Sequence, residues 1–379
     1  MKICIVSDFF VPHYQGGGER RYYEIAKRMV KNGHSVDVIC MKISGVVDFE
    51  EIEGINIHHI GPEIKKPPER KSSDFIKFIC SVFKWILTHS YDVIDAQTYA
   101  PLFPSFIGAK IKKTPIIATI HDVSTGGDDQ WIQSSKTAAI VEKILARMPY
   151  NKIITVSNET KNSLIEYYRV KEDRVCVVYN GVDIKLIDSV QIDEKYKNTI
   201  IFVGRLAPHK HVNHLIKIMK SLKKEIADVK LLIVGTGVEK DNLTVLTKNY
   251  GLQDNVKFLE NLDYIELITE MKKSNMLVLP STREGFGMVL AEANACKIPV
   301  VAYASGGVVE VVKNGINGFL VEPEDLNSLE KHVKLLLNND FESLKLGKNG
   351  YNIVKSNFNW DNITKDILNI YTDSGDFEW

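Results

Sequence analysis

The sequence predicts an α/β protein with two doubly wound halves, and three observations point to this fold class. Short runs rich in Val and Ile alternate with longer amphipathic stretches along the 379-residue chain. The alternation lapses in the polar segment Asp183–Asn198 and restarts at Ile200. Each half also opens with an apolar run that is followed by a loop rich in Gly or in cations. Because near-continuous β-branched runs are typical of parallel strands buried on both faces, each half should form an open parallel sheet with intervening helices.

The elements of the first half follow in regular order. A strand over Lys2–Val6 precedes a Gly-containing loop and then a helix over Glu19–Lys31, whose apolar residues recur with helical spacing. Later strands are expected wherever a short apolar run recurs, at Ser35–Cys40, Tyr91–Ala96, Pro115–Ile120, Lys152–Val156 and Val175–Val178.

The second half repeats this order after a domain boundary near residues 185–198. Its strands are expected at Ile200–Val203, Lys230–Val234, Val256–Phe258, Met276–Leu279 and Pro299–Ala302. Two Rossmann-like domains facing a central cleft would bind their ligand at the carboxyl ends of the strands, where such sheets change strand order.

Composition excludes several classes of protein. Lys plus Arg and Asp plus Glu both number 48, so the zero net charge argues against a nucleic-acid partner. Five widely spaced cysteines without a Cys-x-x-Cys pair predict neither a disulfide framework nor a zinc site, and reduced thiols suit the cytoplasm. The first apolar run is too short for the core of a signal peptide. The sequence contains no run of about 18 apolar residues, so no membrane-spanning helix is expected.

The loop after the first strand contains Gly16, Gly17 and Gly18 directly before a helix. Glycines let the backbone approach a ligand, and the start of the helix offers free N–H groups and the positive end of its dipole. The triplet therefore suits a phosphate or sugar, although a plain tight turn accounts for it equally well. The spacing differs from the dinucleotide-binding Gly-x-Gly-x-x-Gly fingerprint.

The loop after the strand at Ile200–Val203 carries two cations. Gly204 and Arg205 follow this strand, and Lys210 comes five residues after Arg205. Cations at the carboxyl end of a parallel strand can neutralise a diphosphate as it leaves. A surface loop with ordinary charges is the equally weighted alternative.

The segment Glu284–Glu292 reads EGFGMVLAE, follows a predicted strand and turn, and runs into the next predicted helix. Gly285 and Gly287 expose backbone N–H groups where the helix starts, which suits a phosphate. Glu284 can accept hydrogen bonds from sugar hydroxyls. Glu292 stands in an apolar stretch and needs partners there, which the two hydroxyls of a ribose would supply. The alternative is a capping acid and a structural ion pair.

His121 follows the strand at Pro115–Ile120, again at a carboxyl end. It could hydrogen-bond a sugar or assist a proton transfer, although a lone histidine is more often structural. The chain contains no Asp-x-Asp pair and no compact cluster of metal ligands. The charge of a diphosphate would then be offset by Arg205, Lys210 and helix N-termini rather than by a divalent metal ion.

Together these segments resemble glycosyltransferase family 4, whose members have the two-domain GT-B fold. The resemblance covers almost the whole chain, through SDFFVPHYQGGGER, VGRL with Lys210, PSTREGFGMVLAEA, ASGGVVEVV and NGINGFLVEPED in that order. The spacing of Glu284 and Glu292, taken with Arg205 and Lys210, is the specific part. His211 stands where the family commonly has Gly, which leaves the charge of the loop unchanged.

The resemblance implies a retaining, metal-independent hexosyltransferase. It implies residues 1–190 as acceptor domain, 191–355 as nucleotide-sugar domain, and 356–379 as a helix that packs back on the first domain. The donor, a UDP- or GDP-sugar, is a co-substrate, so no cofactor is expected, and the acceptor is a glycan or a lipid-linked acceptor. The resemblance implies that Arg205 and Lys210 hold the diphosphate, Glu292 holds the ribose, and His121 lies near the sugar C6 hydroxyl. It implies that Glu284 and five backbone amides hold the sugar and the distal phosphate, namely those of Gly285, Phe286, Gly287, Met288 and Val289. The backbone of four glycines would lie close to the donor: Gly16, Gly17, Gly18 and Gly204.

Two other functions fit the same architecture. A nucleotide-sugar epimerase would need several catalytic carboxylates and histidines, of which only His121 can be placed in the cleft. A non-catalytic sugar-nucleotide-binding protein would not need the intact set of Arg205, Lys210, Glu284 and Glu292. An assay with a panel of donors distinguishes the three.

The stretch Lys65–Thr88 predicts an unusually apolar helix after a basic run. Six cations and two acids lie between residues 65 and 84, and the polar residues of the helix form one narrow stripe. Such a helix is either packed almost all round or lies in a membrane interface with its cations toward lipid phosphates. The second alternative would place the enzyme at the inner face of the membrane.

Overall fold

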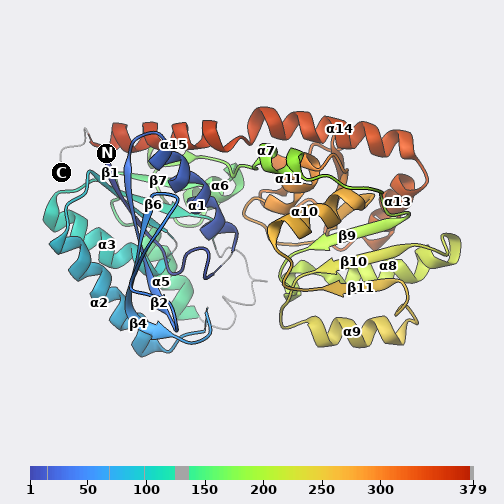
Figure 1. The fold of residues 1–379 in the computed structure, drawn as a ribbon, viewed down its shortest axis with the longest axis horizontal. Helices are drawn as coiled ribbons and strands as arrows, with labels where there is room; N and C mark the ends of the chain where they lie inside the picture. Colours follow the sequence, from blue (N-terminus) through green and yellow to red (C-terminus); the bar gives the residue numbers. More distant parts are fainter. Residues whose placement is uncertain (15, 68, 98, 124–135, 376–379) are drawn as a thin grey trace. The chain divides into compact units, whose positions relative to one another are not determined.

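The computed structural model describes residues 1–14, 16–67, 69–97, 99–123 and 136–375. The chain divides into two compact units. Unit 1 consists of Met1–Asn180 together with the residues from Trp360 on, and unit 2 is Gly181–Asn359. Each unit is an α/β domain with its own sheet (Figure 1).

Unit 1 has a sheet of eight strands within its described residues, in the order β3-β4-β2-β1-β5-β6-β7-β8. All neighbours pair parallel except β3, which runs antiparallel to β4. The strand order reverses between β1 and β5, so loops after these strands border the switch point. The strands are β1 Lys2–Val6, β2 Ser35–Ile43, β3 Phe49–Ile52, β4 Ile55–Ile64, β5 Val93–Gln97, β6 Ile116–Ile120, β7 Lys152–Thr155 and β8 Val175–Val177.

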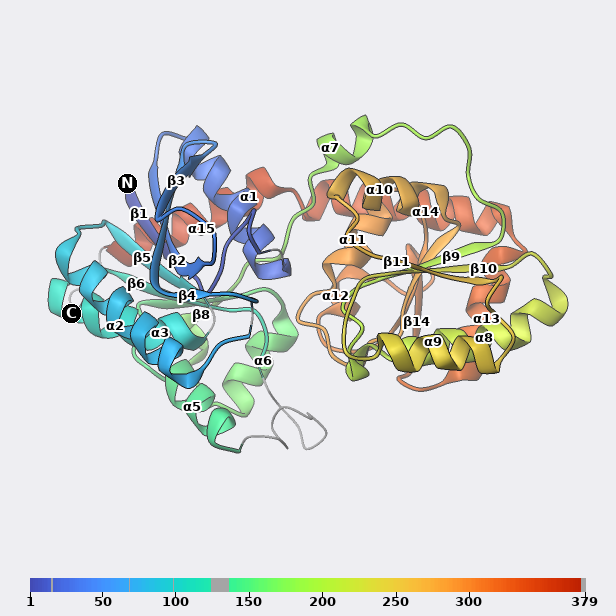
Figure 2. The same cartoon turned by 60° about the horizontal axis from the view of Figure 1, so that its bottom comes forward.

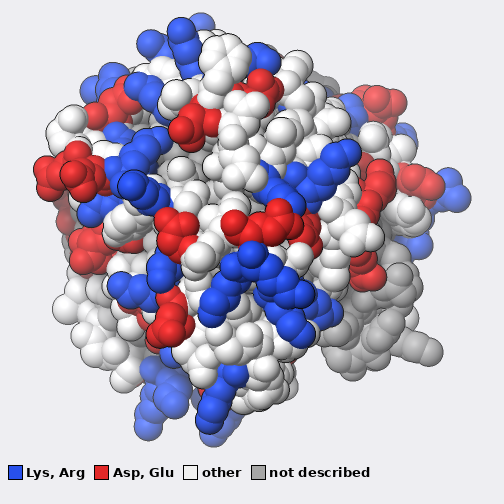
Figure 3. All heavy atoms as spheres, turned by 90° about the vertical axis from the view of Figure 1, so that its right-hand side faces the viewer, with Lys and Arg blue, Asp and Glu red and all other residues white. Residues whose placement is uncertain are grey.

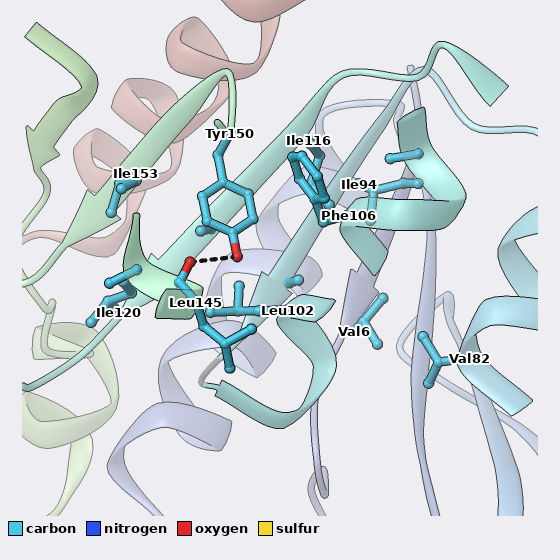
Figure 4. Packing of buried hydrophobic residues seen from close by; sticks show 14 of the residues in the cluster. Val6, Val82, Ile94, Leu102, Phe106, Ile116, Ile120, Leu145, Tyr150 and Ile153 are labelled. Atoms are coloured by element: carbon cyan, nitrogen blue, oxygen red, sulfur yellow. Dashed lines mark hydrogen bonds between the residues drawn. The ribbon is translucent and has the colours of Figure 1, made fainter. Parts of the chain in front are cut away.

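Helices cover both faces of this sheet (Figure 2). On one face α1 contacts α15, and on the other α2 contacts α3, which contacts α5. The second face holds a continuous apolar core, in which Tyr150 packs against Phe106 and donates its hydroxyl hydrogen bond to the Leu145 carbonyl at 2.9 Å (Figure 4). The helices are α1 Gly17–Lys31, α2 Ser72–Thr88, α3 Tyr99–Lys112, α5 Lys136–Ala146, α6 Asn158–Glu166 and α15 Trp360–Gly375.

Unit 2 has a fully parallel sheet of six strands in its described residues, in the order β11-β10-β9-β12-β13-β14. Its order reverses between β9 and β12. The strands are β9 Thr199–Val203, β10 Lys230–Val234, β11 Val256–Leu259, β12 Met276–Leu279, β13 Val300–Tyr303 and β14 Gly318–Val321. The helices are α7 Ile184–Ser189, α8 Val212–Glu225, α9 Lys240–Asn249, α10 Tyr264–Lys273, α11 Met288–Ala295, α12 Val308–Val311, α13 Leu326–Leu337 and α14 Asp340–Asn357.

The expected strands are present with shifts of a few residues at their ends, and the β3–β4 hairpin is an addition. Its turn is Glu53-Gly54, both with positive φ, and over residues 55–60 β4 alternates buried and partly exposed residues, as a strand with one face toward the core does. The pairing of β3 with β4 brings side chains of both strands next to the loop that follows β1.

The boundary between the units lies at 180/181, ten residues before the expected 190/191. Residues after Gly181 bond to unit 2, because the Val182 N–H donates to the Phe358 carbonyl at 2.8 Å and Tyr351 donates to the Asp188 carboxylate at 2.7 Å. The second boundary lies at 359/360, four residues after the expected 355/356, because α14 continues to Asn357. The last helix, α15, belongs to unit 1, where Asp361 accepts a hydrogen bond from Arg28 at 2.8 Å.

The helix α2 is not packed all round. It buries one narrow face, Phe78, Val82 and Ile86, whereas Ile76 is 60% exposed and Cys80 is exposed. The polar stripe expected from the sequence lies on the open side, where Lys77, Lys84 and Thr88 are exposed.

No described helix is both long and apolar enough to span a membrane. On the face shown in Figure 3, Lys and Arg side chains are interspersed with Asp and Glu side chains, as the zero net charge leads one to expect.

Candidate functional site

Loops from four strands of unit 2 meet at the carboxyl edge of its sheet. The loop after β9 bonds to the loop after β12, because the Thr282 N–H donates to the His209 carbonyl at 3.0 Å. The loop after β13 bonds to the same segment, since the Ser305 hydroxyl donates to the Ser281 carbonyl at 2.6 Å. The loop after β10 approaches β9 so closely that a Cβ on Gly235 would lie 2.0 Å from the Gly204 carbonyl oxygen. The switch point between β9 and β12 is therefore surrounded by rigidly joined backbone.

This arrangement brings Lys210 and Glu284 together, although they are 74 positions apart in the sequence. They form an ion pair in which the lysine side chain is 16% exposed and the glutamate side chain 13%. Arg205 lies on the same loop as Lys210, is exposed, and its guanidinium makes no hydrogen bond or ion pair with side chains or carbonyls of the described residues. A half-buried cation beside a carboxylate, with a second cation open to solvent, can receive a ligand that has both anionic groups and hydroxyls.

The EGFG segment forms a tight turn into α11. Gly287 is the N-cap residue with φ +86°, a left-handed conformation that favours glycine, and Met288 and Val289 form the first turn of the helix. Phe286 is buried and packs edge-on against Phe358 at 5.2 Å between ring centroids. The N–H groups at such a helix start have no partner inside the helix, so the turn can bind an anion.

The pair Gly306-Gly307 in the loop after β13 packs against the backbone of the EGFG turn. The Gly307 N–H donates to the Glu284 carbonyl at 2.9 Å. A Cβ on Gly306 would lie 2.1 Å from the Glu284 carbonyl oxygen, and one on Gly307 would lie 2.2 Å from that of Gly285. Only glycine fits at either position while the turn keeps its place. The segment ASGGVVEVV contributed to the family resemblance in the sequence, but nothing in the sequence showed which segment this glycine pair supports.

Glu292 is 5% exposed and lies on the second turn of α11. Its Oε1 accepts a hydrogen bond at 3.2 Å from the hydroxyl of Tyr264, at the start of α10. The buried carboxylate thus has a hydroxyl partner, as its position in an apolar stretch requires. Tyr264 has no signal in the sequence that marks it as part of a site.

The remaining predicted site residues form a second group, in unit 1. Gly16 is the N-cap residue of α1, and Gly17 and Gly18 are its first residues. His121 lies at the carboxyl end of β6, where a Cβ on Gly18 would be 3.3 Å from its Nε2. The glycines therefore allow α1 to begin directly beside the imidazole.

A chain of hydrogen bonds fixes the tautomer of His121. Gln97 donates its amide N–H to Asp95 Oδ1 at 2.8 Å, so its Oε1 faces His121 Nε2 at 3.1 Å and must accept from it. Nδ1 then lacks a proton and can accept a hydrogen bond from a sugar hydroxyl. Burial and the nearby Arg21 lower the pKa of His121 to about 3, so the ring is neutral at physiological pH.

Asp95 is the centre of a buried polar network that sequence reasoning missed. Its carboxylate is fully buried and accepts hydrogen bonds from Tyr22 and Thr119 at 2.9 Å each, and from Tyr371 of α15. Burial raises its pKa to about 6, and these hydrogen bonds limit the rise. The only sequence signal is an acid within the apolar run at 93–97.

Arg21 lies next to this network and is also fully buried. Its guanidinium donates to the carbonyls of Val178 and Tyr179 at 2.9 and 2.6 Å and to the Asn180 side chain at 2.6 Å. It therefore holds the last residues of the first segment of unit 1 against α1. Such a charge is stable in the interior only because several acceptors surround it.

The low pKa of His121 predicts an acid-dependent loss of stability that His121→Asn should reduce. Between pH about 6.5 and about 3, the unfolded chain binds a proton at this residue and the folded chain does not, so stability falls as pH falls. One such proton changes the free energy of unfolding by at most about 1.4 kcal/mol per pH unit. Thermal unfolding at pH 7 and pH 5 should show a smaller decrease in Tm for His121→Asn than for the unchanged chain.

Protonation of Asp95 has the opposite effect on stability as pH falls, so in the unchanged chain it opposes the effect of His121. Because its folded pKa lies near 6 and its ordinary value is 3.8, the folded chain binds the proton more readily between these values, and the contribution of Asp95 to stability is lost as pH rises. His121→Asn should therefore reveal the stabilising effect of Asp95 protonation. An unchanged difference in Tm between the two pH values would contradict the environment assigned to His121.

The predicted site residues thus form two groups, each at the carboxyl edge of one sheet. Unit 2 brings together those expected on the diphosphate, ribose and sugar, namely Gly204, Arg205, Lys210, Glu284, Gly285, Phe286, Gly287, Met288, Val289 and Glu292. Unit 1 brings together Gly16, Gly17, Gly18 and His121. The loops of each group follow the strands that flank the switch point or lie next to it.

Two family models match the chain. Residues 15–186 match the model described as glycosyltransferase family 4, and residues 184–373 match that described as glycosyl transferases group 1. An uncharacterized glycosyltransferase of Methanocaldococcus jannaschii is 30% identical over 390 residues, covering 98% of each chain. A glycogen synthase of Mycobacterium tuberculosis is 25% identical over 391 residues, covering 98% of this chain and 94% of the relative.

Solved structures share the fold of the whole chain. A sucrose-phosphate synthase from Thermosynechococcus elongatus has a TM-score of 0.85 and 23% identity and covers 98% of both chains. The Anabaena protein HepE in complex with UDP and glucose has a TM-score of 0.79 and 22% identity, covering 98% of this chain and all of that one. The shared fold is the two-domain α/β arrangement of GT-B glycosyltransferases.

Proposed function

This chain is a hexosyltransferase of glycosyltransferase family 4, and we propose that it moves a hexose from a nucleotide-diphosphate sugar to a glycan or lipid-linked acceptor with retention of configuration. The observation that carries the proposal is the Lys210–Glu284 pair beside the start of α11. One carboxylate, two cations and a helix start adjoin one switch point, which matches the hydroxyls and the diphosphate of such a donor.

The proposed transfer is a front-face displacement. The bond from the sugar C1 to the diphosphate oxygen breaks as a bond from the acceptor hydroxyl to C1 forms on the same face. The acceptor proton moves to the departing diphosphate, so no protein carboxylate acts as nucleophile. Arg205, Lys210 and the amides that begin α11 stabilise the negative charge that grows on the leaving group.

Other side chains position the donor. Glu292 accepts the ribose hydroxyls, with Tyr264 orienting its carboxylate. Glu284 accepts hydroxyls of the transferred sugar once the diphosphate takes up Lys210. His121 offers Nδ1 to a sugar hydroxyl, because its Nε2–H is held by Gln97. Support for a uridine donor comes from HepE, which was solved with UDP and with UDP-glucose, and GDP-sugars remain the second group to test.

A screen of nucleotide sugars tests the proposal. UDP-, GDP- and ADP-sugars should be added to the full-length chain in thermal-shift assays, because a ligand that binds only the folded chain raises Tm. We expect one nucleotide to raise Tm, and mass analysis should then detect a glycosylated acceptor or, without acceptor, free sugar and nucleoside diphosphate. An isomerised nucleotide sugar would indicate an epimerase, and binding without turnover a non-catalytic protein.

Transfer should persist in excess EDTA. The reason is that Arg205 and Lys210 supply positive charge that a divalent metal ion would otherwise bring to the diphosphate. Initial rates with and without EDTA should agree within about twofold at saturating donor. An activity that disappears in EDTA and returns with Mg²⁺ or Mn²⁺ would overturn this assignment.

The proposed location is the inner face of the membrane, through the basic segment and α2. The reduced state that suits its free cysteines supports a cytoplasmic enzyme, and the exposed apolar and cationic side of α2 supports membrane contact. Arg70 is excluded from this role, because it donates to Asp8 at 2.8 Å. The exposed lysines available for lipid phosphates are Lys65, Lys66, Lys71, Lys77 and Lys84.

Liposome co-sedimentation tests this location. The chain should bind anionic vesicles at low salt and leave them at high salt, because each lysine near such a surface contributes about 1 kcal/mol. Replacement of three lysines by serine should remove binding, whereas the same change in the basic run at the carboxyl end of α3 and directly after it should not. The first set is Lys65, Lys66 and Lys71, and the control set is Lys110, Lys112 and Lys113. An absence of binding at low salt would instead indicate a transferase that works away from the membrane.

A further inference from the structure

Three side chains with metal-binding atoms meet near the rim of the unit 1 sheet. His13 lies in the loop after β1, Glu50 on β3 and His59 on β4. The Nε2 atoms of both histidines lie 2.8 Å from the same oxygen, Glu50 Oε1. The three ligand atoms all lie within 4.8 Å of one another. We propose that these residues bind one divalent transition-metal ion, of which Zn²⁺ is the best match.

The donor set determines the class of ion. Two imidazoles and one carboxylate favour Zn²⁺, Co²⁺ or Ni²⁺, whereas Mg²⁺ and Ca²⁺ favour oxygen ligands alone. Three protein ligands leave a fourth position for water, as in open zinc sites. With bonds of about 2.0–2.1 Å, ligand atoms of a tetrahedral ion lie roughly 3.3 Å apart. The Glu50 carboxylate therefore has to withdraw by about half an ångström from each histidine.

The surroundings of the cluster permit this change. Glu50 lies on the edge strand β3 and its side chain is 20% exposed, so it can move toward solvent. His13 is 29% exposed, which gives an ion a route to the site. His59, in contrast, is 1% exposed and fixed within the sheet, so it supplies a rigid ligand.

A second contact orients His59 for metal binding. Its Nδ1 lies 3.4 Å from Sγ of the buried Cys40 on β2. When Nε2 gives its lone pair to the ion, Nδ1 carries the proton and points it at this sulfur. Contacts of this kind fix the tautomer of histidines that bind metals. The ion would be surrounded by groups from β2, β3, β4 and the loop after β1.

The position of His13 gives the ion a structural role. His13 is three residues before Gly16, the N-cap of α1, so an ion at this site ties the loop that precedes Gly16, Gly17 and Gly18 to the β3–β4 hairpin. None of its ligands belongs to either group of proposed donor residues. The ion takes no part in the chemistry of transfer. A failure of the proposed metal site would therefore leave the metal-independent mechanism untouched, and a failure of the mechanism would leave the metal site untouched.

Metal titration of the full-length chain tests the site. The chain is treated with EDTA, dialysed free of the chelator, and titrated with Zn²⁺ or Co²⁺ in a Cys80→Ser background, because Cys80 is an exposed thiol that could bind metal. We expect one ion per chain, a Co²⁺ absorption spectrum typical of tetrahedral N and O ligands, and a higher Tm with the ion bound. Glu50→Gln and His13→Asn should each weaken binding tenfold or more.

Two controls identify the ligands. Glu51→Gln changes an exposed neighbour on the same strand and should leave binding unchanged. His34→Asn removes an imidazole that lies 3.1 Å from the N-terminal amine, a pair that could also bind metal, and should likewise have no effect. The proposal is overturned if no stoichiometric ion binds, if binding survives in both Glu50→Gln and His13→Asn, or if it is lost in His34→Asn.

Discussion

Replacement of Lys210 by alanine should lower the turnover of the nucleotide sugar by two orders of magnitude or more. Lys210 is held beside Glu284 at the switch point of the unit 2 sheet, where the leaving diphosphate gains charge in the proposed reaction. Loss of one preorganised donor to a transition-state anion costs about 10²–10³ in kcat. Arg205→Ala should act in the same direction, and steady-state kinetics should show the decrease mainly in kcat rather than in the KM for donor.

The control for this experiment is Lys217→Ala, on the exposed side of α8, which should turn over normally. Lys210→Ala leaves the Glu284 carboxylate, whose side chain is 13% exposed, without its cation, so the free energy of unfolding should fall by about 1–3 kcal/mol, and rates are compared well below the resulting Tm. Near-normal rates in both Arg205→Ala and Lys210→Ala would show that neither cation assists the leaving group.

Gly307→Ala should reduce donor binding and turnover at least 100-fold, although Gly307 is not itself among the proposed donor-binding residues. The added Cβ would lie 2.2 Å from the Gly285 carbonyl oxygen and 2.8 Å from the Cα of Phe286. Both are backbone atoms, so the EGFG turn must move and carry its amides out of position. A displacement of about 1 Å can cost 10²-fold in rate, and overpacking costs typically 1–3 kcal/mol in stability.

Gly315→Ala separates the two consequences of this change. Gly315 has φ +72° and no atom near its missing Cβ, so alanine there strains the backbone without displacing the turn. Its Tm should fall while turnover, measured well below that Tm, stays near normal. Gly307→Ala with normal donor affinity and rate would show that the turn does not hold the donor.

The sheets could be predicted from the sequence because most of their strands are buried on both faces. Runs such as those at 2–6 and 230–234 lack polar residues after their first position. Because these runs are too short for a helix, they predict buried strands. The β3–β4 hairpin was missed because its strands alternate polar and apolar residues and its turn is Glu53-Gly54. That dipeptide is a weaker signal than the Asn-Gly or Asp-Gly of common hairpin turns.

The candidate site could be predicted where its residues lie close together in the sequence and form a recognisable motif. The EGFG turn and the two cations have this property, and the structure places them on adjoining loops. The Asp95 network and the cluster of His13, Glu50 and His59 do not, because their members lie on different elements and meet only when the sheet forms. Nor does the sequence show that Gly307 supports Glu284 and Gly285, since this contact depends on the pairing of β12 with β13.

The most direct test of the central claim is the release of nucleoside diphosphate from a nucleotide sugar by the full-length chain in EDTA. A panel of UDP-, GDP- and ADP-sugars should be compared for the unchanged chain and for Lys210→Ala. The account predicts release from one class of donor, accompanied by the transferred or free hexose, and a loss of at least 100-fold in Lys210→Ala. Release from no donor, or equal release by both proteins, would contradict it.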